Sequence, residues 1–165
     1  MEHFRYLNQT YHMQDLDKVV ITGGSAGGVG VFFWTQYLQD HTKSAKIYSI
    51  PDSGLFLLDY ESPITKQKIV KIQTSNLLTL IGNSSQSYPE PVKKCYNHIH
   101  DLVLCLDASN FAEYITAPMF LVQSSYDEWS IANLLAVHCA TNKSPPFSLD
   151  SCNDTEMSAI SDYHK

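Results

Sequence analysis

The stretch VVITGGSAGGVGVFFW, residues 19–34, places one serine inside a cluster of four glycines. A run of β-branched residues, typical of a buried strand, comes before the cluster, and an apolar segment of helical length follows it. Ser25 therefore stands where a predicted strand, 18–22, turns into a predicted helix, 26–40. Two interpretations compete: Ser25 is a nucleophile held on a tight turn, or it is an ordinary N-cap in a glycine-rich loop.

The nucleophile interpretation makes specific demands on the residues around Ser25. Residues 23–27 fit the pattern G-x-S-x-G, in which glycines two positions before and after the serine remove side chains that would clash in a strained turn. The backbone N–H of Ala26 would then lie at a helix N-terminus, aimed at a developing oxyanion. A phosphate-binding loop is a third interpretation, but the GxxxxGK[ST] pattern is absent.

The rest of the chain predicts a parallel α/β sheet with flanking helices. Two further strands are expected at 45–50 and 117–124, and among the helices between them one is expected at 92–105. Three strands are too few for a complete sheet of this class. We therefore expect residues 1–165 to be one domain, the central part of a larger α/β fold whose N- and C-terminal portions are missing.

Composition excludes several classes of function. The chain has 165 residues and a formal net charge of −6, so it lacks the basic surface that nucleic acids attract. No segment reaches the roughly 20 apolar residues of a membrane span. No CxxC pair is present, so the sequence predicts no metal site.

Cysteines and sequons point to an oxidising compartment. Two sequence-local disulfides, Cys95–Cys105 and Cys139–Cys152, are the simplest of three possible pairings. Four N-x-S/T sequons begin at Asn8, Asn83, Asn142 and Asn153. We expect a secreted or vacuolar protein. The N-terminal residues do not resemble a signal peptide, which again favours a fragment.

A serine nucleophile needs a base and an acid to orient that base. Asp127 follows the third predicted strand, where α/β-hydrolases carry the acid, whereas Asp52 follows the second strand too closely. Only His138 and His164 come after Asp127. Each is expected to be structural, because one ends a helix beside a cysteine and the other lies on a helix near the chain end. The residues therefore leave the triad without a base.

Several blocks together resemble the pectinacetylesterase and Notum-type carboxylesterase family. They are ITGGSAGG, KIYSIPDSGLFLLDY, a helix bounded by cysteines, and APMFLVQSSYDEWSI. The resemblance implies a secreted α/β-hydrolase without a metal or organic cofactor, and a family disulfide at Cys95 and Cys105. It makes Ser25 the nucleophile, Asp127 the acid and Ala26 an oxyanion donor, with Asp52 on the substrate side.

Parts of the family pattern are absent from this sequence. The family's glycine-rich segment with tryptophan, upstream of the nucleophile, and its cysteine-flanked histidine have no counterpart here. The resemblance implies hydrolysis of a carboxylic ester, such as deacetylation of pectin or another acylated carbohydrate, by the complete enzyme. Residues 1–165 alone are expected to be inactive. The alternative is a truncated, catalytically dead paralogue that acts in binding or structure.

Overall fold

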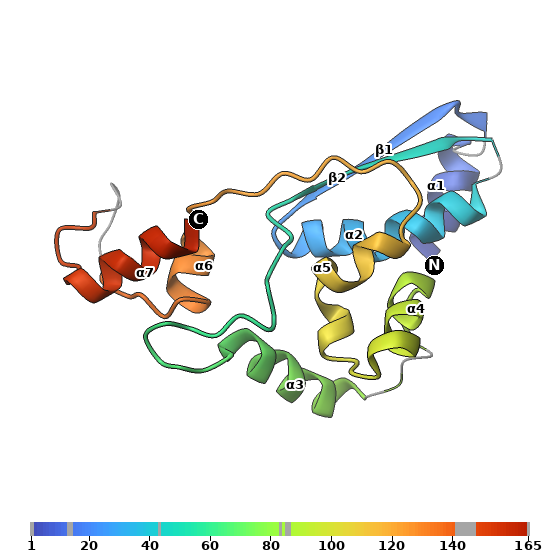
Figure 1. Ribbon diagram of the computed structural model, residues 1–165. Coiled ribbons are helices and arrows are strands. Elements are labelled where there is room, and N and C mark those ends of the chain that lie inside the picture. The colour runs from blue at the N-terminus through green and yellow to red at the C-terminus, as the bar shows by residue number, and fades with distance from the viewer. Residues whose placement is uncertain are drawn as a thin grey trace.

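The computed structural model describes residues 2–12, 15–42, 44–82, 84, 87–140 and 148–164. Two parallel strands, β1 (Lys18–Gly24) and β2 (Lys46–Asp52), are joined by helix α2 (Ala26–His41). Their register runs from Lys18 opposite Lys46 to Gly24 opposite Asp52. Figure 1 shows α2 lying along one side of this strand pair. The predicted order of strand, helix and parallel strand is confirmed.

The predicted third strand, 117–124, runs parallel to β2 but forms two isolated bridges, centred on Met119 and Val122. Pro51 of β2 lies between these bridges. Its carbonyl accepts a hydrogen bond from Val122 N–H at 3.0 Å, but proline has no N–H to donate in return. The segment therefore pairs as a strand at both ends, with one backbone bond missing in the middle.

The remaining helices are distributed along the chain after β2, except for α1, which precedes β1. They are α1 (Glu2–Tyr11), α3 (Ile69–Ile81), α4 (Glu90–Ile99), η3 (Leu104–Leu106), α5 (Ala108–Phe111), η4 (Ala112–Tyr114), α6 (Glu128–Asn133) and α7 (Asp154–His164). Among the described residues, no helix has both the length and the apolar character needed to cross a membrane.

The helix predicted over 92–105 is wrong at its C-terminal end. Helix α4 stops at Ile99 because His100 takes a left-handed conformation, with φ 58°, and its N–H bonds to Tyr96 O at 2.9 Å. The chain then turns and re-enters helical structure as η3. Two short elements therefore stand where the sequence predicts one continuous helix.

The main core lies between α2, α4 and α5. Phe32 of α2, Val92 of α4 and Phe111 of α5 are all at most 1% exposed. The rings of Phe32 and Phe111 meet edge to face, with centroids 6.3 Å apart. Burial of side chains of this size stabilises a fold by about 1.5–3 kcal/mol each, so this cluster holds α2 in place.

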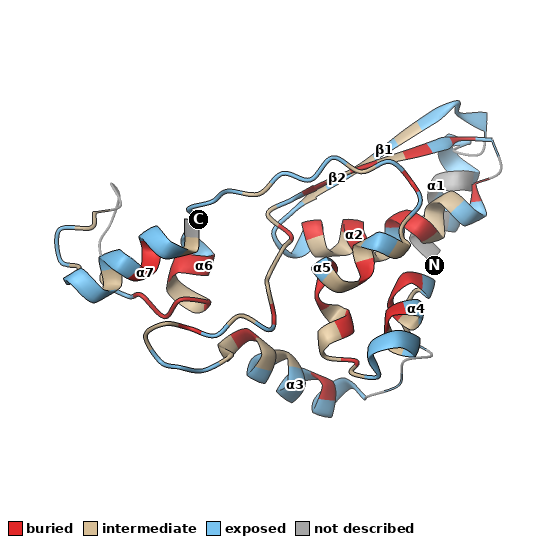
Figure 2. Cartoon of the chain, in the orientation of Figure 1, coloured by how far each residue is buried: buried red, intermediate tan, exposed pale blue. Residues whose placement is uncertain are grey.

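The face of the sheet away from α2 remains open among the described residues. Side chains of β1 alternate between intermediate and exposed, and Val20 is 59% exposed. Phe120, on the segment beside β2, is 71% exposed. Figure 2 shows most of that segment exposed. The expected parallel sheet with flanking helices is confirmed. In the described part of the chain, the helix that packs on the sheet is α2, on one face.

Both expected disulfides are present, and they differ in burial. Cys95–Cys105 joins α4 to η3 inside the main core, where both cysteines are 0% exposed. Cys139–Cys152 lies beside α7, where both cysteines are only partly buried. The two bonds should therefore differ in their access to reductant.

We expect stepwise reduction of the two disulfides. A mild thiol reductant should open Cys139–Cys152 first, because a thiolate must reach a sulfur atom to attack it. Alkylation followed by peptide mass spectrometry would identify the modified cysteines. The matched comparison replaces each pair in turn by alanine. Loss of Cys95–Cys105 should cost about 3 kcal/mol of unfolding free energy. Simultaneous modification of all four cysteines in the native state would contradict the expected order.

Candidate active site

Ser25 lies at the turn between β1 and α2, and its backbone has an unusual conformation. Its φ is 54° and its ψ is −120°. This combination is energetically unfavourable for any residue that has a side chain. The residue is exposed. Its side chain makes no capping hydrogen bond to α2, although it occupies the N-cap position. The ordinary N-cap interpretation therefore has no hydrogen bond to support it.

The backbone around Ser25 is held by the end of β2. Ser25 N–H donates to Asp52 O at 2.9 Å, and Val29 N–H donates to Ser25 O at 3.1 Å. The strained turn is thus bonded on one side to the neighbouring strand and on the other to the first turn of α2. These two bonds fix the Ser25 backbone while leaving its hydroxyl exposed.

The glycines around Ser25 have different roles. A Cβ atom on Gly23 would lie 2.5 Å from Gly27 O, so only glycine fits at position 23. A Cβ on Gly27 would meet nothing within 4 Å. The sequence-based expectation that both glycines of G-x-S-x-G avoid a clash is therefore right for Gly23 and wrong for Gly27.

Two other glycines bring α2 into backbone contact with the loop after β2. A Cβ on Gly28 would lie 2.5 Å from Asp52 O and 3.0 Å from Gly54 Cα. A Cβ on Gly54 would lie 2.7 Å from the carbonyl carbon of Gly28. No local pattern predicted this pair, although Gly54 is visible in the motif DSG that follows the second predicted strand.

Ala26, the expected oxyanion donor, is the first residue of α2. It is exposed, like Ser25 beside it. The N-terminus of a helix of 16 residues carries a partial positive charge from its aligned peptide dipoles. The position suits an N–H group that stabilises negative charge on a substrate oxygen.

Asp52 ends β2 directly beside Ser25, to which its carbonyl is bonded. Its carboxylate is exposed, and its Oδ1 accepts a hydrogen bond from the Ser53 hydroxyl at 2.8 Å. Ser53 N–H in turn donates to Val122 O at 2.8 Å. The structure thus brings Asp52 and Ser25 together at the carboxyl edge of the sheet, where open α/β sheets bind ligands.

A glutamine that the sequence analysis did not single out anchors the same loop. Gln123, next to Val122, accepts a hydrogen bond at Oε1 from Leu55 N–H at 3.2 Å. The three strand ends are therefore connected through residues 52–55. Because this contact spans 68 positions of sequence, no local pattern could have indicated it.

Asp127 follows the third strand segment at the same edge of the sheet. It is partly buried and is the N-cap of α6, where its Oδ2 accepts a hydrogen bond from Ser130 N–H at 2.7 Å. A carboxylate at this place can orient a histidine through its other oxygen. The capping bond also gives Asp127 a structural role. A test of its part in catalysis must therefore distinguish loss of stability from loss of activity.

The expected triad still lacks an assigned base. His138 is exposed, and His164 is the last residue of α7. The nucleophile and acid positions therefore share an edge of the sheet, and neither histidine is assigned as their base.

One group of possible metal ligands occurs among the described residues, and it lies away from Ser25. It consists of Cys139, Cys152 and Glu156. Both sulfur atoms are joined in a disulfide, so they cannot act as thiolate ligands. This group is unsuited to holding a metal ion.

The sequons are only partly described. Asn153 is exposed at the start of α7, where its Oδ1 accepts from Glu156 N–H at 3.0 Å. This cap uses the oxygen of the amide and leaves the nitrogen for attachment of a glycan. Asn8 lies on α1, whereas Asn83 and Asn142 lie outside the described residues.

Solved structures place the fold among α/β-hydrolase-like proteins. Two crystal forms of the Wnt deacylase Notum from Drosophila superpose with a TM-score of 0.66 each, at 18% and 17% sequence identity. Each alignment covers 96% of this chain, and 44% or 42% of the Notum chain. At this identity the likeness concerns the fold.

The family follows from the sequence comparisons. The pectinacetylesterase profile matches residues 2–165, and the chain belongs to that family. Pectin acetylesterase 5 of Arabidopsis thaliana is 27% identical over 124 residues, and pectin acetylesterase 11 is 24% identical over 125 residues. These alignments cover 74% and 75% of this chain but 27% and 30% of the relatives. The chain thus spans less than a third of their length.

Proposed function

We propose that the protein is a serine carboxylic-ester hydrolase that removes acyl groups from a polysaccharide such as acetylated pectin. The observation that carries the proposal is the conformation of Ser25: an exposed serine, strained at a strand-to-helix turn, whose hydroxyl caps nothing. Strain of this kind persists where the surroundings enforce it and often marks a reacting group. Family membership supplies the substrate class.

The proposed reaction uses these residues as follows. The Ser25 hydroxyl oxygen attacks the ester carbonyl while a histidine takes its proton, and the Ala26 N–H stabilises the oxyanion. The sugar alcohol leaves with that proton and an acyl-serine remains. Water then hydrolyses the acyl-serine and releases the acid. Asp127 orients the histidine, and Asp52 lies beside the ester on the substrate side.

The proposal predicts that the whole protein hydrolyses esters and that residues 1–165 alone do not. Because the family's cysteine-flanked histidine has no counterpart in residues 1–165, we expect these residues alone to be close to inactive. The whole protein should release acetate from acetylated pectin and p-nitrophenol from p-nitrophenyl acetate. We also expect a secreted or vacuolar location, because disulfides such as the two in this chain form and persist in oxidising compartments.

The assay compares acetate release by the whole protein with release by a heat-denatured sample and from chemically deacetylated pectin. A fluorophosphonate probe, followed by peptide mass spectrometry, identifies the reactive serine and should label Ser25. Absence of both hydrolysis and labelling would contradict the proposal. It would favour the alternative, in which the protein is a catalytically dead relative that acts in binding or structure.

Asp127 has a capping role and a proposed catalytic role, and two substitutions separate them. Asp127→Asn keeps an oxygen that can accept the Ser130 N–H, so the stability of α6 should change little. Asp127→Ala removes the cap and should cost about 1 kcal/mol of unfolding free energy. If Asp127 orients the base, both variants lose at least about a hundredfold in kcat/KM of the whole protein.

Urea unfolding and ester hydrolysis, measured on both Asp127 variants, check these expectations. An active, fully stable Asp127→Asn protein would assign Asp127 to capping alone. The control is Asp107→Asn, because Asp107 also caps a helix, α5, through Ser109 N–H and has no proposed part in the reaction. Its Oδ2 accepts the Leu58 N–H as well, so this variant should lose stability while hydrolysis by the folded protein is unchanged.

A further inference from the structure

A cleft of about 340 Å³ lies between the C-terminal half of α2 and the N-terminus of α4. Its size is in the range of small-ligand sites. Ser25 is at the opposite end of α2: with a rise of 1.5 Å per residue, Tyr37 is about 16 Å along the helix from its first residue. The cleft is therefore separate from the candidate active site.

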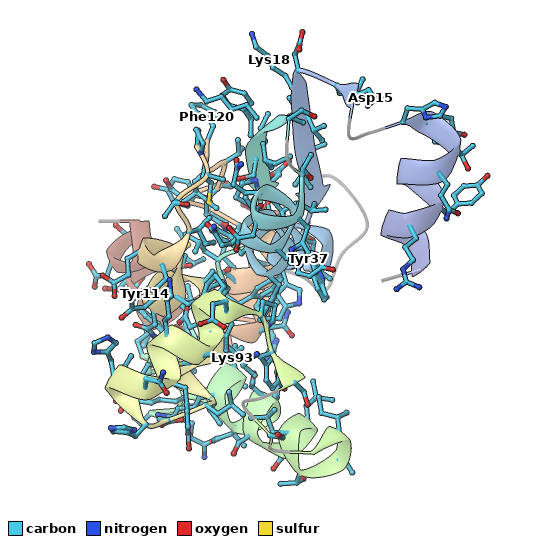
Figure 3. All side chains as sticks on the ribbon, turned by 90° about the vertical axis from the view of Figure 1, so that its right-hand side faces the viewer. Asp15, Lys18, Tyr37, Lys93, Tyr114 and Phe120 are labelled. Atoms are coloured by element: carbon cyan, nitrogen blue, oxygen red, sulfur yellow. A yellow bond between two sulfur atoms is a disulfide. The ribbon has the colours of Figure 1, made fainter. Side chains whose placement is uncertain are left out.

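Aromatic rings form the walls of this cleft. Trp34, Tyr37 and Tyr88 all line it. Trp34 is 50% exposed and meets Tyr37 at 90°, with ring centroids 5.8 Å apart, so the two rings form a corner. Tyr88, two residues before α4, packs against Phe33 of α2 with ring centroids 6.5 Å apart, so its ring is held against α2. Figure 3 shows the side of the molecule on which Tyr37 of α2 is found.

Neighbouring contacts hold the α2 wall in place. The His41 ring stacks on Tyr37, with centroids 4.0 Å apart, and its Nδ1 donates a hydrogen bond to Tyr37 O at 2.8 Å. Asp40 Oδ1 accepts a hydrogen bond from Gln36 Nε2 at 2.7 Å. The Tyr37 ring and the Asp40 carboxylate are thus held by their own helix before any ligand arrives, which lowers the ordering cost of binding.

Hydrogen-bonding groups in the cleft are left unused by the described part of the chain. Glu90 and Lys93 line it from α4, the helix on which Figure 3 labels Lys93, and Trp34 lines it from α2. These residues carry a carboxylate, an ammonium and an indole N–H. No hydrogen bond or ion pair joins these three groups to another described residue. The cleft therefore offers a donor and an acceptor on one helix and a second donor on the other.

Aromatic faces beside unused donors and acceptors suit a sugar ring. The C–H face of a pyranose packs on an aromatic ring, while its hydroxyl groups both donate and accept hydrogen bonds. The charges in the cleft decide between sugar types: Asp40 and Glu90 stand against Lys93, giving a formal charge of −1 with His41 counted as neutral. A negatively charged uronic acid residue is disfavoured there.

We propose that the cleft between α2 and α4 binds an uncharged sugar residue of a polysaccharide, at a second site remote from Ser25. The proposal rests on the proposed function for its ligand class, a polysaccharide, and on the cleft itself for the uncharged sugar. Such a site would hold a neutral part of a long substrate chain while the ester reacts elsewhere. It raises the local concentration of esters near Ser25 without entering the reaction.

The test measures binding without turnover. A Ser25→Ala protein is titrated with soluble galactan, a neutral polysaccharide, by affinity gel electrophoresis and calorimetry. Adding Trp34→Ala should weaken galactan binding about tenfold, because one stacking face and one donor are lost. Lys93→Met, which keeps the aliphatic stem, should weaken it severalfold. Tyr11→Ala, which removes a tyrosine that is 62% exposed outside the cleft, should leave binding unchanged.

Four results would overturn the proposal: no binding of galactan, equal binding by the Trp34→Ala protein, equal losses in the Trp34→Ala and Tyr11→Ala proteins, or binding of polygalacturonate in preference to galactan. Each substitution is made at a side chain that is not fully buried, and melting curves establish that the variants are folded. Hydrolysis of p-nitrophenyl acetate should be unaffected by Trp34→Ala. If that hydrolysis is absent in the parent protein, the proposed function fails while the binding result still stands on its own.

Discussion

Replacing Ser25 by alanine is expected to lower ester hydrolysis by the whole protein about ten-thousandfold or more. Alanine has no hydroxyl to attack the carbonyl, so only the oxyanion donors and substrate binding continue to act on the ester. The measurement is kcat/KM for p-nitrophenyl acetate together with acetate release from acetylated pectin. The control is Ser75→Ala, because Ser75 is exposed on α3, away from the turn.

A second substitution at the same position tests why the turn is strained. Alanine keeps a Cβ at a φ of 54°, so Ser25→Ala should leave the unfolding free energy nearly unchanged. Ser25→Gly removes the Cβ and relieves the strain, and it should stabilise the protein by about 1 kcal/mol while abolishing activity. The variant that is more stable is thus expected to be inactive.

Activity in either variant would show that Ser25 is not the nucleophile. Equal stability of the alanine and glycine variants would show that the turn stores no strain at this residue. The two outcomes are independent, so the catalytic assignment and the account of the backbone can fail separately. A stabilised, inactive glycine variant supports both.

Gly28→Ala is expected to destabilise the protein by about 3 kcal/mol. The added methyl group would lie 2.5 Å from Asp52 O and 3.0 Å from Gly54 Cα. Both atoms belong to the backbone, so no change of side-chain rotamer can make room. Helix α2 must move away from the loop after β2, and this movement strains the bond from Ser25 N–H to Asp52 O.

The matched control for Gly28→Ala is Gly30→Ala. Gly30 lies on the same helix, and a Cβ there would meet nothing within 4 Å. Alanine is favoured over glycine inside a helix by about 1 kcal/mol, so the control should be stabilised. Urea unfolding of both variants measures the difference. Similar stability of the two would contradict the close approach of α2 to the loop at residues 52–54.

Local patterns were enough to predict the centre of this fold. The β-branched run, the glycine cluster and the apolar segment around Ser25 predicted β1, the turn and α2, because each depends on preferences of neighbouring residues. The disulfide pairing was also predicted correctly, since both bonds join cysteines only 10 and 13 residues apart. The same short blocks of sequence also predicted membership of the pectinacetylesterase family, which the family profile confirms.

Local patterns failed at two places, one decided by a distant residue and one by a turn without a sequence signal. The 117–124 segment has the composition of a strand, but the gap in its pairing comes from Pro51, 70 residues from its partner position in the ladder. Helix α4 ends at Ile99 because His100 turns left-handed. None of residues 97–103 is a glycine or proline that would have announced this end.

The amino-acid sequence by itself determined the strand-to-helix turn, its serine and the short disulfides, because these depend on residues close together along the chain. The tertiary structure alone decided which glycines are indispensable. Gly28 and Gly54 are required because two backbones meet there, whereas Gly27, inside the motif, faces open space. Contacts of this kind, like the bond from Leu55 to Gln123 and the cleft between α2 and α4, arise only when the chain brings distant segments together.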